Sequence, residues 1–114
     1  MVGGFVIDEN ARRVLIRGLG PTLGDLGVVG ALSDSQITVF KAGGREIAFN
    51  DNWGAQPNAD TIATVSAAVG AFPLAEGSLD AALLLYLAPG AYTVHLTGVN
   101  DEVGVGLIEV YRVP

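Results

Sequence analysis

The chain has no cysteine, one histidine and few basic side chains. Without cysteine it cannot form disulfides or thiolate metal sites, but its redox compartment stays undecided, since many secreted bacterial modules contain no cystine. Six Lys and Arg against twelve Asp and Glu give a formal net charge of −6. That charge would repel phosphate backbones, so nucleic acid is not an expected partner.

The sequence also lacks an unbroken apolar run and a basic leader. Residues 77–99 carry only one charge, Asp80, but Pro89 and Gly90 divide this stretch into strand-length pieces, so we expect no membrane insertion. A strand-like run follows Met1 at once, so no signal peptide is expected in this chain. Both ends fall at predicted element boundaries. We therefore expect one domain, residues 1–114, excised from a longer multidomain protein.

What the sequence contains in quantity is apolar residues and glycine. Half of the residues are hydrophobic, 16% are charged, and 16 are glycine. This composition is far from that of disordered chains, and a domain of this length buries about two thirds of its unfolded surface. Many glycines among β-branched residues favour sheets with many turns over helices.

Apolar residues recur at every second position in several segments, the spacing of strands with one buried face. The last third predicts strands at 81–87, 91–99 and 103–111, joined by tight turns at 88–90 and 100–102. Further strands are predicted at 2–7, 12–17, 36–41 and 46–49. The turns at 8–11 and 42–44 are typical of hairpins.

Segment 12–17 is expected to turn Val14 and Ile16 to the core, and its other face carries Arg13 and Arg17 around Leu15. Residues 18–34 predict an ordered loop with at most one helical turn near 22–26. Asn58 as N-cap and Ile62, Val65 and Val69 at helical spacing predict a helix over about 59–69, at one end or side of the sandwich. We therefore expect an all-β, jelly-roll-like sandwich of about seven to eight mostly antiparallel strands with one short helix.

Several segments together resemble a known kind of module: GGFVI, RVLIRGLGPTL, GAL, NDNW, LAPGAYTVHLTG and VGLIEVY, which span Gly3 to Tyr111. The sequence looks like a repeated all-β module of large secreted or surface-anchored bacterial proteins, and is distantly similar to bacterial pre-peptidase C-terminal domains, which are jelly-roll-like sandwiches. The resemblance implies a secreted or cell-surface location and no enzymatic activity. Longer members have a strand-like segment before GGFVI, and its absence here is expected to leave a sheet edge open to another chain.

The densest polar cluster is Asn50, Asp51 and Asn52, followed by Trp53. Oxygen ligands in succession suit calcium, and Asp101 or Glu102 would join Asn50 and Asp51 if the two loops share one end of the sandwich. The preferred alternative is a turn in which these side chains hold the strand exit and Trp53 covers the core edge. Because Trp53 is the aromatic residue in a loop, the same four residues are also the candidate carbohydrate site.

Arg17 and Glu109 interrupt apolar strands, and an unpaired charge there would be costly to bury. The preferred account is a structural ion pair of Arg17 with Glu109 or with Asp34. The alternative is an anion site formed by Arg13 and Arg17.

His95 lies mid-strand between Thr93 and Thr97 with no serine nearby, so we expect no enzyme and no catalytic residues. We expect a non-catalytic structural or adhesive module of an extracellular bacterial protein that serves as a spacer or protein-contact unit. Its partners would be other domains or copies of itself, bound through sheet edges, with assembly into a fibre as one form. The alternative is a calcium- or carbohydrate-binding module; apart from that calcium, no cofactor is expected.

Overall fold

The computed structural model describes residues 1–114, which fold into seven strands and four short helical segments. The strands are β1 (Val2–Ile7), β2 (Arg12–Leu19), β3 (Ser35–Lys41), β4 (Arg45–Asn50), β5 (Ala81–Leu87), β6 (Gly90–Gly98) and β7 (Leu107–Val113). The helices are α1 (Pro21–Asp25) and α2 (Ala59–Ala68), and two 3-10 turns are η1 (Trp53–Ala55) and η2 (Val99–Asp101). No helix has the length and apolarity to span a bilayer.

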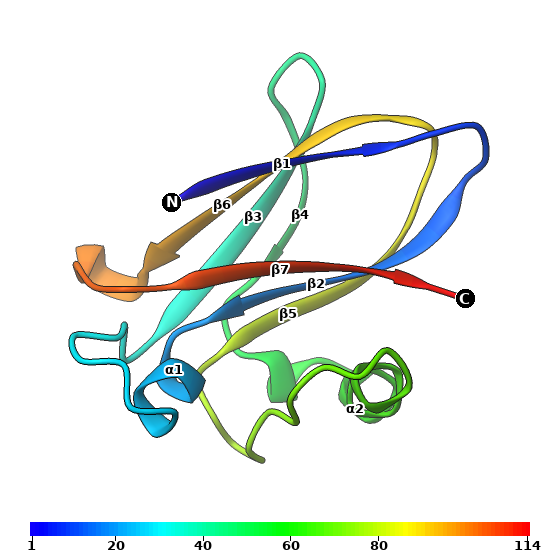
Figure 1. Cartoon of the computed structure of the whole chain (residues 1–114). Helices are drawn as coiled ribbons and strands as arrows, with labels where there is room; N and C mark the ends of the chain where they lie inside the picture. Colours follow the sequence, from blue (N-terminus) through cyan, green and yellow to red (C-terminus); the bar gives the residue numbers. More distant parts are fainter.

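The strands form two antiparallel sheets that pack face to face (Figure 1). The four-stranded sheet has the order β1-β6-β3-β4, and the three-stranded sheet has the order β5-β2-β7. The predicted all-β sandwich is therefore confirmed. The predicted helix is α2, and α1 is the single helical turn expected near residues 22–26.

Most tight turns connect the two sheets and do not make hairpins, so the predicted hairpin at residues 8–11 is wrong. β1 pairs with β6, whereas β2 pairs with β5 and β7. The turns after β5 and β6 likewise cross between sheets, and only β3 and β4 form a hairpin. A local turn signal indicates that the chain reverses; pairing depends on where the apolar faces meet.

The last strand begins later than predicted. β7 starts at Leu107, and the segment before it pairs only through an isolated parallel bridge between Ala31 and Val105. Gly104 and Gly106 lie in this segment, where a Cβ on Gly104 would meet the Gly30 carbonyl and Leu32, and one on Gly106 would meet the Leu96 side chain. The alternation of valine and glycine at 103–106 thus reflects close packing under a loop rather than a strand.

Two hydrophobic cores lie on opposite faces of the three-stranded sheet. The first lies between the sheets and includes Val14, Ile16 and Val94. The second lies between this sheet and α2, and it unites Leu15 with Ile62. The prediction of a single core face for β2 is therefore wrong. Because α2 covers the other face, all residues from Val14 to Leu19 are buried.

The helix α2 is held by its apolar stripe more than by its ends. Ile62 is fully buried and Val65 nearly so. Asn58 occupies the N-cap position, but its side chain makes no capping hydrogen bond, contrary to the prediction. The helix lies over the outer face of the three-stranded sheet (Figure 1), so its position is decided by burial of one side.

Candidate functional site

Asn50, the first residue of the predicted ligand loop, joins the two sheets. Its Oδ1 accepts a hydrogen bond of 3.0 Å from the Ala82 N–H, and its Nδ2 donates to the Asn52 carbonyl. Gln56 Nε2 donates to the Ala82 carbonyl at 2.9 Å. Both backbone groups of Ala82 on the free side of β5 are thus satisfied by side chains. This is the arrangement expected of a residue that fixes a strand exit.

Trp53 packs into the second core and is 7% exposed. Its Nε1 donates to Ser78 Oγ at 3.2 Å, and its backbone N–H donates to the Asp80 carbonyl. It does not present the open ring face on which a sugar stacks. The exposed aromatic side chains are Tyr86 at 73%, Phe72 at 61% and Phe49 at 51%, and no sequence pattern distinguished them from the other aromatic residues.

Asp34, in the loop before β3, lies near Asp51 at the exit of β4 and, less closely coupled, near Glu102 after β6. Desolvation raises the pKa of Asp34, the nearby Asp51 carboxyl raises it further, and Glu102 adds a weaker repulsion. The Oδ1 atoms of Asp34, Asp51 and Asn52 are buried and accept no hydrogen bond. Asp34 is therefore the residue that connects the two predicted loops.

Glu102 has a different role from the rest of this cluster. Its carboxylate accepts hydrogen bonds from the Ser33 N–H and Oγ and from the Asp34 N–H. These bonds, led by the Ser33 N–H, lower the pKa of Glu102. Asp101, its neighbour, is exposed and has a φ of 60°. No three His, Cys, Asp or Glu side chains are placed to share one metal ion.

Asp80 is a buried carboxylate that the sequence reasoning did not single out. It is fully buried, and its Oδ1 accepts from the N–H groups of Gly20 and Thr22 at 2.8 and 3.1 Å. Its Oδ2 accepts from Thr22 Oγ1 at 2.6 Å and from Ser78 Oγ at 2.8 Å. Asp80 is the single charge in a long uncharged stretch of the sequence. This isolation was the one indication that it would be buried and would need hydrogen-bond partners.

Arg17 lies on the outer face of the three-stranded sheet and is fully buried. Its Nε is 3.0 Å from Glu109 Oε1 on the neighbouring strand β7, where the two residues are register partners. Its Nη1 donates to the Phe72 carbonyl at 2.7 Å. Asp34 forms no ion pair with it. Arg17 thus connects the loop at Phe72 to the sheet, and Arg13 lies at the exposed end of the same strand.

Tyr111 completes this row of side chains, since its hydroxyl donates to Glu109 Oε2 at 2.9 Å. Desolvation raises the pKa of Tyr111, and the hydrogen bond to Glu109 adds to this effect. His95 is exposed on the outer face of the four-stranded sheet, where its ring contacts that of Phe40 at a centroid distance of 4.6 Å.

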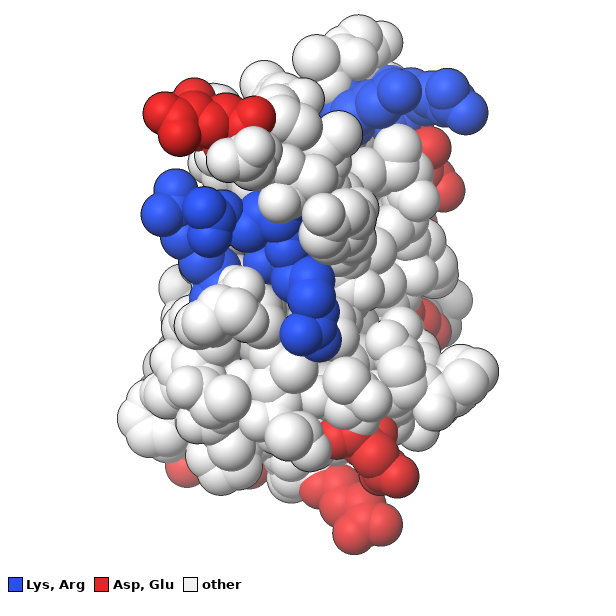
Figure 2. All heavy atoms as spheres, turned by 90° about the vertical axis from the view of Figure 1, so that its right-hand side faces the viewer, with Lys and Arg blue, Asp and Glu red and all other residues white.

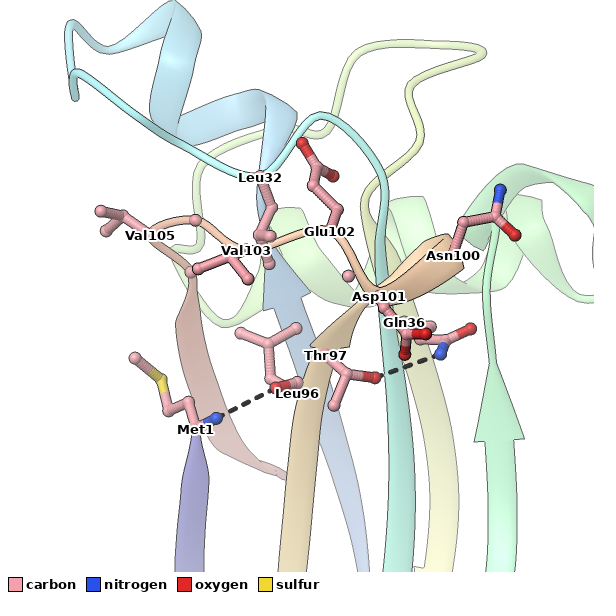
Figure 3. Close-up of a pocket in the computed structure, with 13 residues that line it drawn as sticks. Met1, Leu32, Gln36, Leu96, Thr97, Asn100, Asp101, Glu102, Val103 and Val105 are labelled. Atoms are coloured by element: carbon pink, nitrogen blue, oxygen red, sulfur yellow. Dashed lines mark hydrogen bonds between the residues drawn. The ribbon is translucent and has the colours of Figure 1, made fainter.

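An open groove of about 710 Å³ lies at the Met1 end of the four-stranded sheet. Met1, Leu32, Leu96 and Val103 supply its apolar lining, and Asp101 lies at its rim (Figure 3). In Figure 3 the groove opens between Met1 and the segment that carries Val103 and Val105. Sequence reasoning did not predict it, since residues far apart in the chain form its walls.

Comparisons with protein-family models, with curated proteins and with solved structures gave no match.

Proposed function

We propose that this chain is a non-catalytic structural module of an extracellular bacterial protein, and that it contacts copies of itself or other domains along the free edge of β1. The observation that carries the proposal is the chemistry of this edge. The segment Val2–Ile7 contains no charged residue and no proline, and its pairing with β6 has no bulge. Charged residues, prolines and bulges normally protect the edge strands of soluble proteins from pairing with another chain.

The free backbone groups of β1 follow from its hydrogen bonds. The Met1 N–H donates to the Leu96 carbonyl, and the Leu96 N–H donates to the Met1 carbonyl. Because backbone groups alternate in direction along a strand, the N–H and C=O groups of residues 3, 5 and 7 also point to β6. The N–H and C=O groups of Val2, Gly4 and Val6 point away from the sheet. Val2 and Val6 are 63% and 68% exposed on the same side. An added strand would therefore find backbone partners and an apolar surface.

The location in an extracellular bacterial protein rests on the sequence resemblance alone. The adhesive or spacer role rests on the β1 edge together with the adjacent outer face of the four-stranded sheet. That face presents few charges: Thr38, Thr93, His95 and Phe49 lie on it. A partly apolar surface with few charges is typical of protein-contact sites.

Sedimentation velocity over a range of concentrations tests self-association through this edge. The wild-type chain is expected to gain mass with concentration, and Val6→Lys is expected to stay monomeric, because a charge on an edge strand blocks strand addition. Val29→Lys adds the same charge at a residue that is 93% exposed in a loop, and it is the matched control. A wild-type chain that stays monomeric at every concentration would contradict the proposal.

A second candidate function is calcium binding, and one observation favours it. The buried Oδ1 atoms of Asp34, Asp51 and Asn52 lack donors, and such oxygens are the ligands that calcium prefers. Asp34 and Asp51 repel each other, which a divalent cation would relieve. Asn50 and Glu102 of the predicted site do not belong to this set. The Asn50 oxygen accepts a hydrogen bond from the Ala82 N–H, and the Glu102 carboxylate accepts one from the Ser33 hydroxyl.

Thermal unfolding with calcium and with chelator tests this second function. Bound calcium is expected to raise the melting temperature of the wild type, and Asp51→Asn should remove most of the rise. The exposed Asp60→Asn is the control, since Asp60 lies on α2, outside the cluster. Equal melting temperatures with calcium and with chelator would contradict calcium binding.

A further inference from the structure

The strand β1 is the least protected edge of the sandwich. β4, at the other edge of the same sheet, carries Arg45 and Glu46 and has a bulge in its pairing with β3. In the three-stranded sheet, β7 carries Glu109 and Arg112, and the backbone groups of Ala82 near the start of β5 are bound by side chains. Such features hinder the addition of a strand. Among the edges that a second copy of the chain presents, its own β1 is the one without them.

The free backbone groups of β1 are self-complementary about Gly4. The groups that point away from β6 belong to Val2, Gly4 and Val6. In an antiparallel pair of strands, two opposed residues exchange both backbone hydrogen bonds when the groups of both point across the pair. A two-fold axis at Gly4 places Gly4 opposite Gly4 of the second copy, and Val2 opposite Val6. Every outward-pointing group of these three residues then has a partner.

The side chains of β1 suit this register on both faces of the sheet. On the outer face, Val2 and Val6 are exposed, and pairing covers the valines of each copy with those of the other. On the inner face, Phe5 comes to lie opposite Gly3 of the second copy, and an aromatic ring compensates for glycine at such a cross-strand position. Phe5 is half-buried at the margin of the first core, so a neighbouring strand completes its cover.

The charges beyond the end of β1 select the antiparallel direction. Asp8 and Glu9 follow the strand directly, and Arg12 and Arg13 begin β2 at the same end of the sandwich. Figure 2 shows this end of the molecule, where Lys and Arg gather. In a parallel pair in register, Asp8 would lie beside Asp8 of the second copy, and like charges in that position are destabilising. The antiparallel pair places the two charged ends at opposite ends of the shared sheet.

We propose that two copies of this chain pair through β1 in antiparallel register, with the two-fold axis at Gly4, so that their four-stranded sheets form one continuous sheet. The inference rests on the proposed self-association through β1 and deepens it, since it names the partner and the register. Both copies use the same surface, so the contact closes on itself and assembly stops at the dimer. Because β1 has only six residues, the contact buries little area and the dimer is weak.

Cysteine cross-linking tests the register, because the chain has no cysteine and each variant adds a single thiol. In the proposed pair the two Gly4 Cα atoms are about 5.5 Å apart, within the range of about 4.4 to 6.8 Å that a disulfide spans. Under mild oxidation, Gly4→Cys is expected to form several-fold more cross-linked dimer than Val29→Cys, which measures random collision. A Cβ on Gly4 would meet only the Tyr92 carbonyl, at 3.7 Å, so the variant is expected to fold.

Val2→Cys and Val6→Cys locate the axis. Each alone is expected to cross-link no more than Val29→Cys, because the two copies of Val6 lie about 14 Å apart along the strands. A mixture of Val2→Cys and Val6→Cys places the two thiols opposite each other. The mixture is therefore expected to cross-link several-fold more than either variant alone.

Sedimentation velocity completes the test, since the wild type is expected to reach twice the mass of one chain and no more. Growth beyond two chains, or cross-linking of Val6→Cys alone at the level of Gly4→Cys, overturns the two-fold pairing. If the wild type associates and Val6→Lys does not, but Gly4→Cys cross-links no more than Val29→Cys, the two-fold register is wrong and the β1 edge remains the contact. A wild type that stays monomeric at every concentration rejects both proposals.

Discussion

At the scale of single residues, buried polar side chains connect segments that lie far apart in the chain. Asp80 accepts four hydrogen bonds and joins the loop before β5 to the end of β2 and the start of α1. Arg17 joins β2 to β7 and to the loop after α2. Asn50 joins the end of β4 to β5. Such residues fix loop positions and register more than they add net stability.

Asp80→Asn is expected to lower the free energy of unfolding by about 2 kcal/mol, because hydrogen bonds to a charged group contribute about 1.5 to 3 kcal/mol each and the amide nitrogen cannot accept the hydroxyl bonds. Urea denaturation measures the change. Asp60→Asn, at an exposed position in the first turn of α2, should cost less than about 1 kcal/mol. Equal small losses in both variants would contradict the role assigned to Asp80.

Asp34 gives a prediction about pH. Its pKa is raised above 3.8 in the folded state, so between 3.8 and that raised value the folded chain binds more protons than the unfolded chain. Stability from this group therefore falls as pH rises through that window. Asp34→Asn should be more stable than the wild type at neutral pH, and the gain should shrink toward acidic pH. Denaturation at several pH values checks this, and a gain independent of pH would contradict it.

At the scale of elements, the positions of the helices follow from burial. The helix α2 has little support from its cap, and its buried side packs on β2 through Ile62 and Leu15. Its boundaries were predictable because the 3.6-residue spacing of Ile62, Val65 and Val69 marks them. Its place over the three-stranded sheet was not predictable, since Leu15 next to Arg17 looked like a half-exposed face. The ion pair with Glu109 is what lets that face be covered.

Ile62→Ala is expected to cost about 2 to 5 kcal/mol, the range for truncation of a fully buried isoleucine that leaves a cavity. The neighbouring Thr61→Ala, at an exposed position, should change stability by less than about 0.5 kcal/mol. Chemical denaturation of the two variants makes the comparison. Similar effects would mean that α2 is only loosely attached to the sheet.

At the scale of the whole molecule, β2 belongs to both hydrophobic cores. Val14 and Ile16 face the core between the sheets, and Leu15 faces the core under α2. Unfolding of either core removes support from the other. The molecule is therefore expected to unfold as one cooperative unit.

The single tryptophan allows this to be measured. Trp53 reports on the second core, and far-ultraviolet circular dichroism reports mainly on the sheets. The two signals should follow the same urea transition with the same midpoint. A fluorescence transition at lower urea would show that the layer of α2 and Trp53 separates first, as a local unit.

The sequence by itself determined the class of the fold, because alternation of apolar residues, turn residues and composition are local properties. It also located nearly all strands and α2, and it marked Arg17 and Glu109 as charges that need partners. Only the tertiary structure decided which turns cross between sheets, that β2 is buried on both faces, and that Asp34 lies between Asp51 and Glu102. The groove at the Met1 end of the four-stranded sheet was likewise decided only by the tertiary structure. These features depend on contacts between residues distant in the chain, and a local pattern carries no information about which distant segment will cover it.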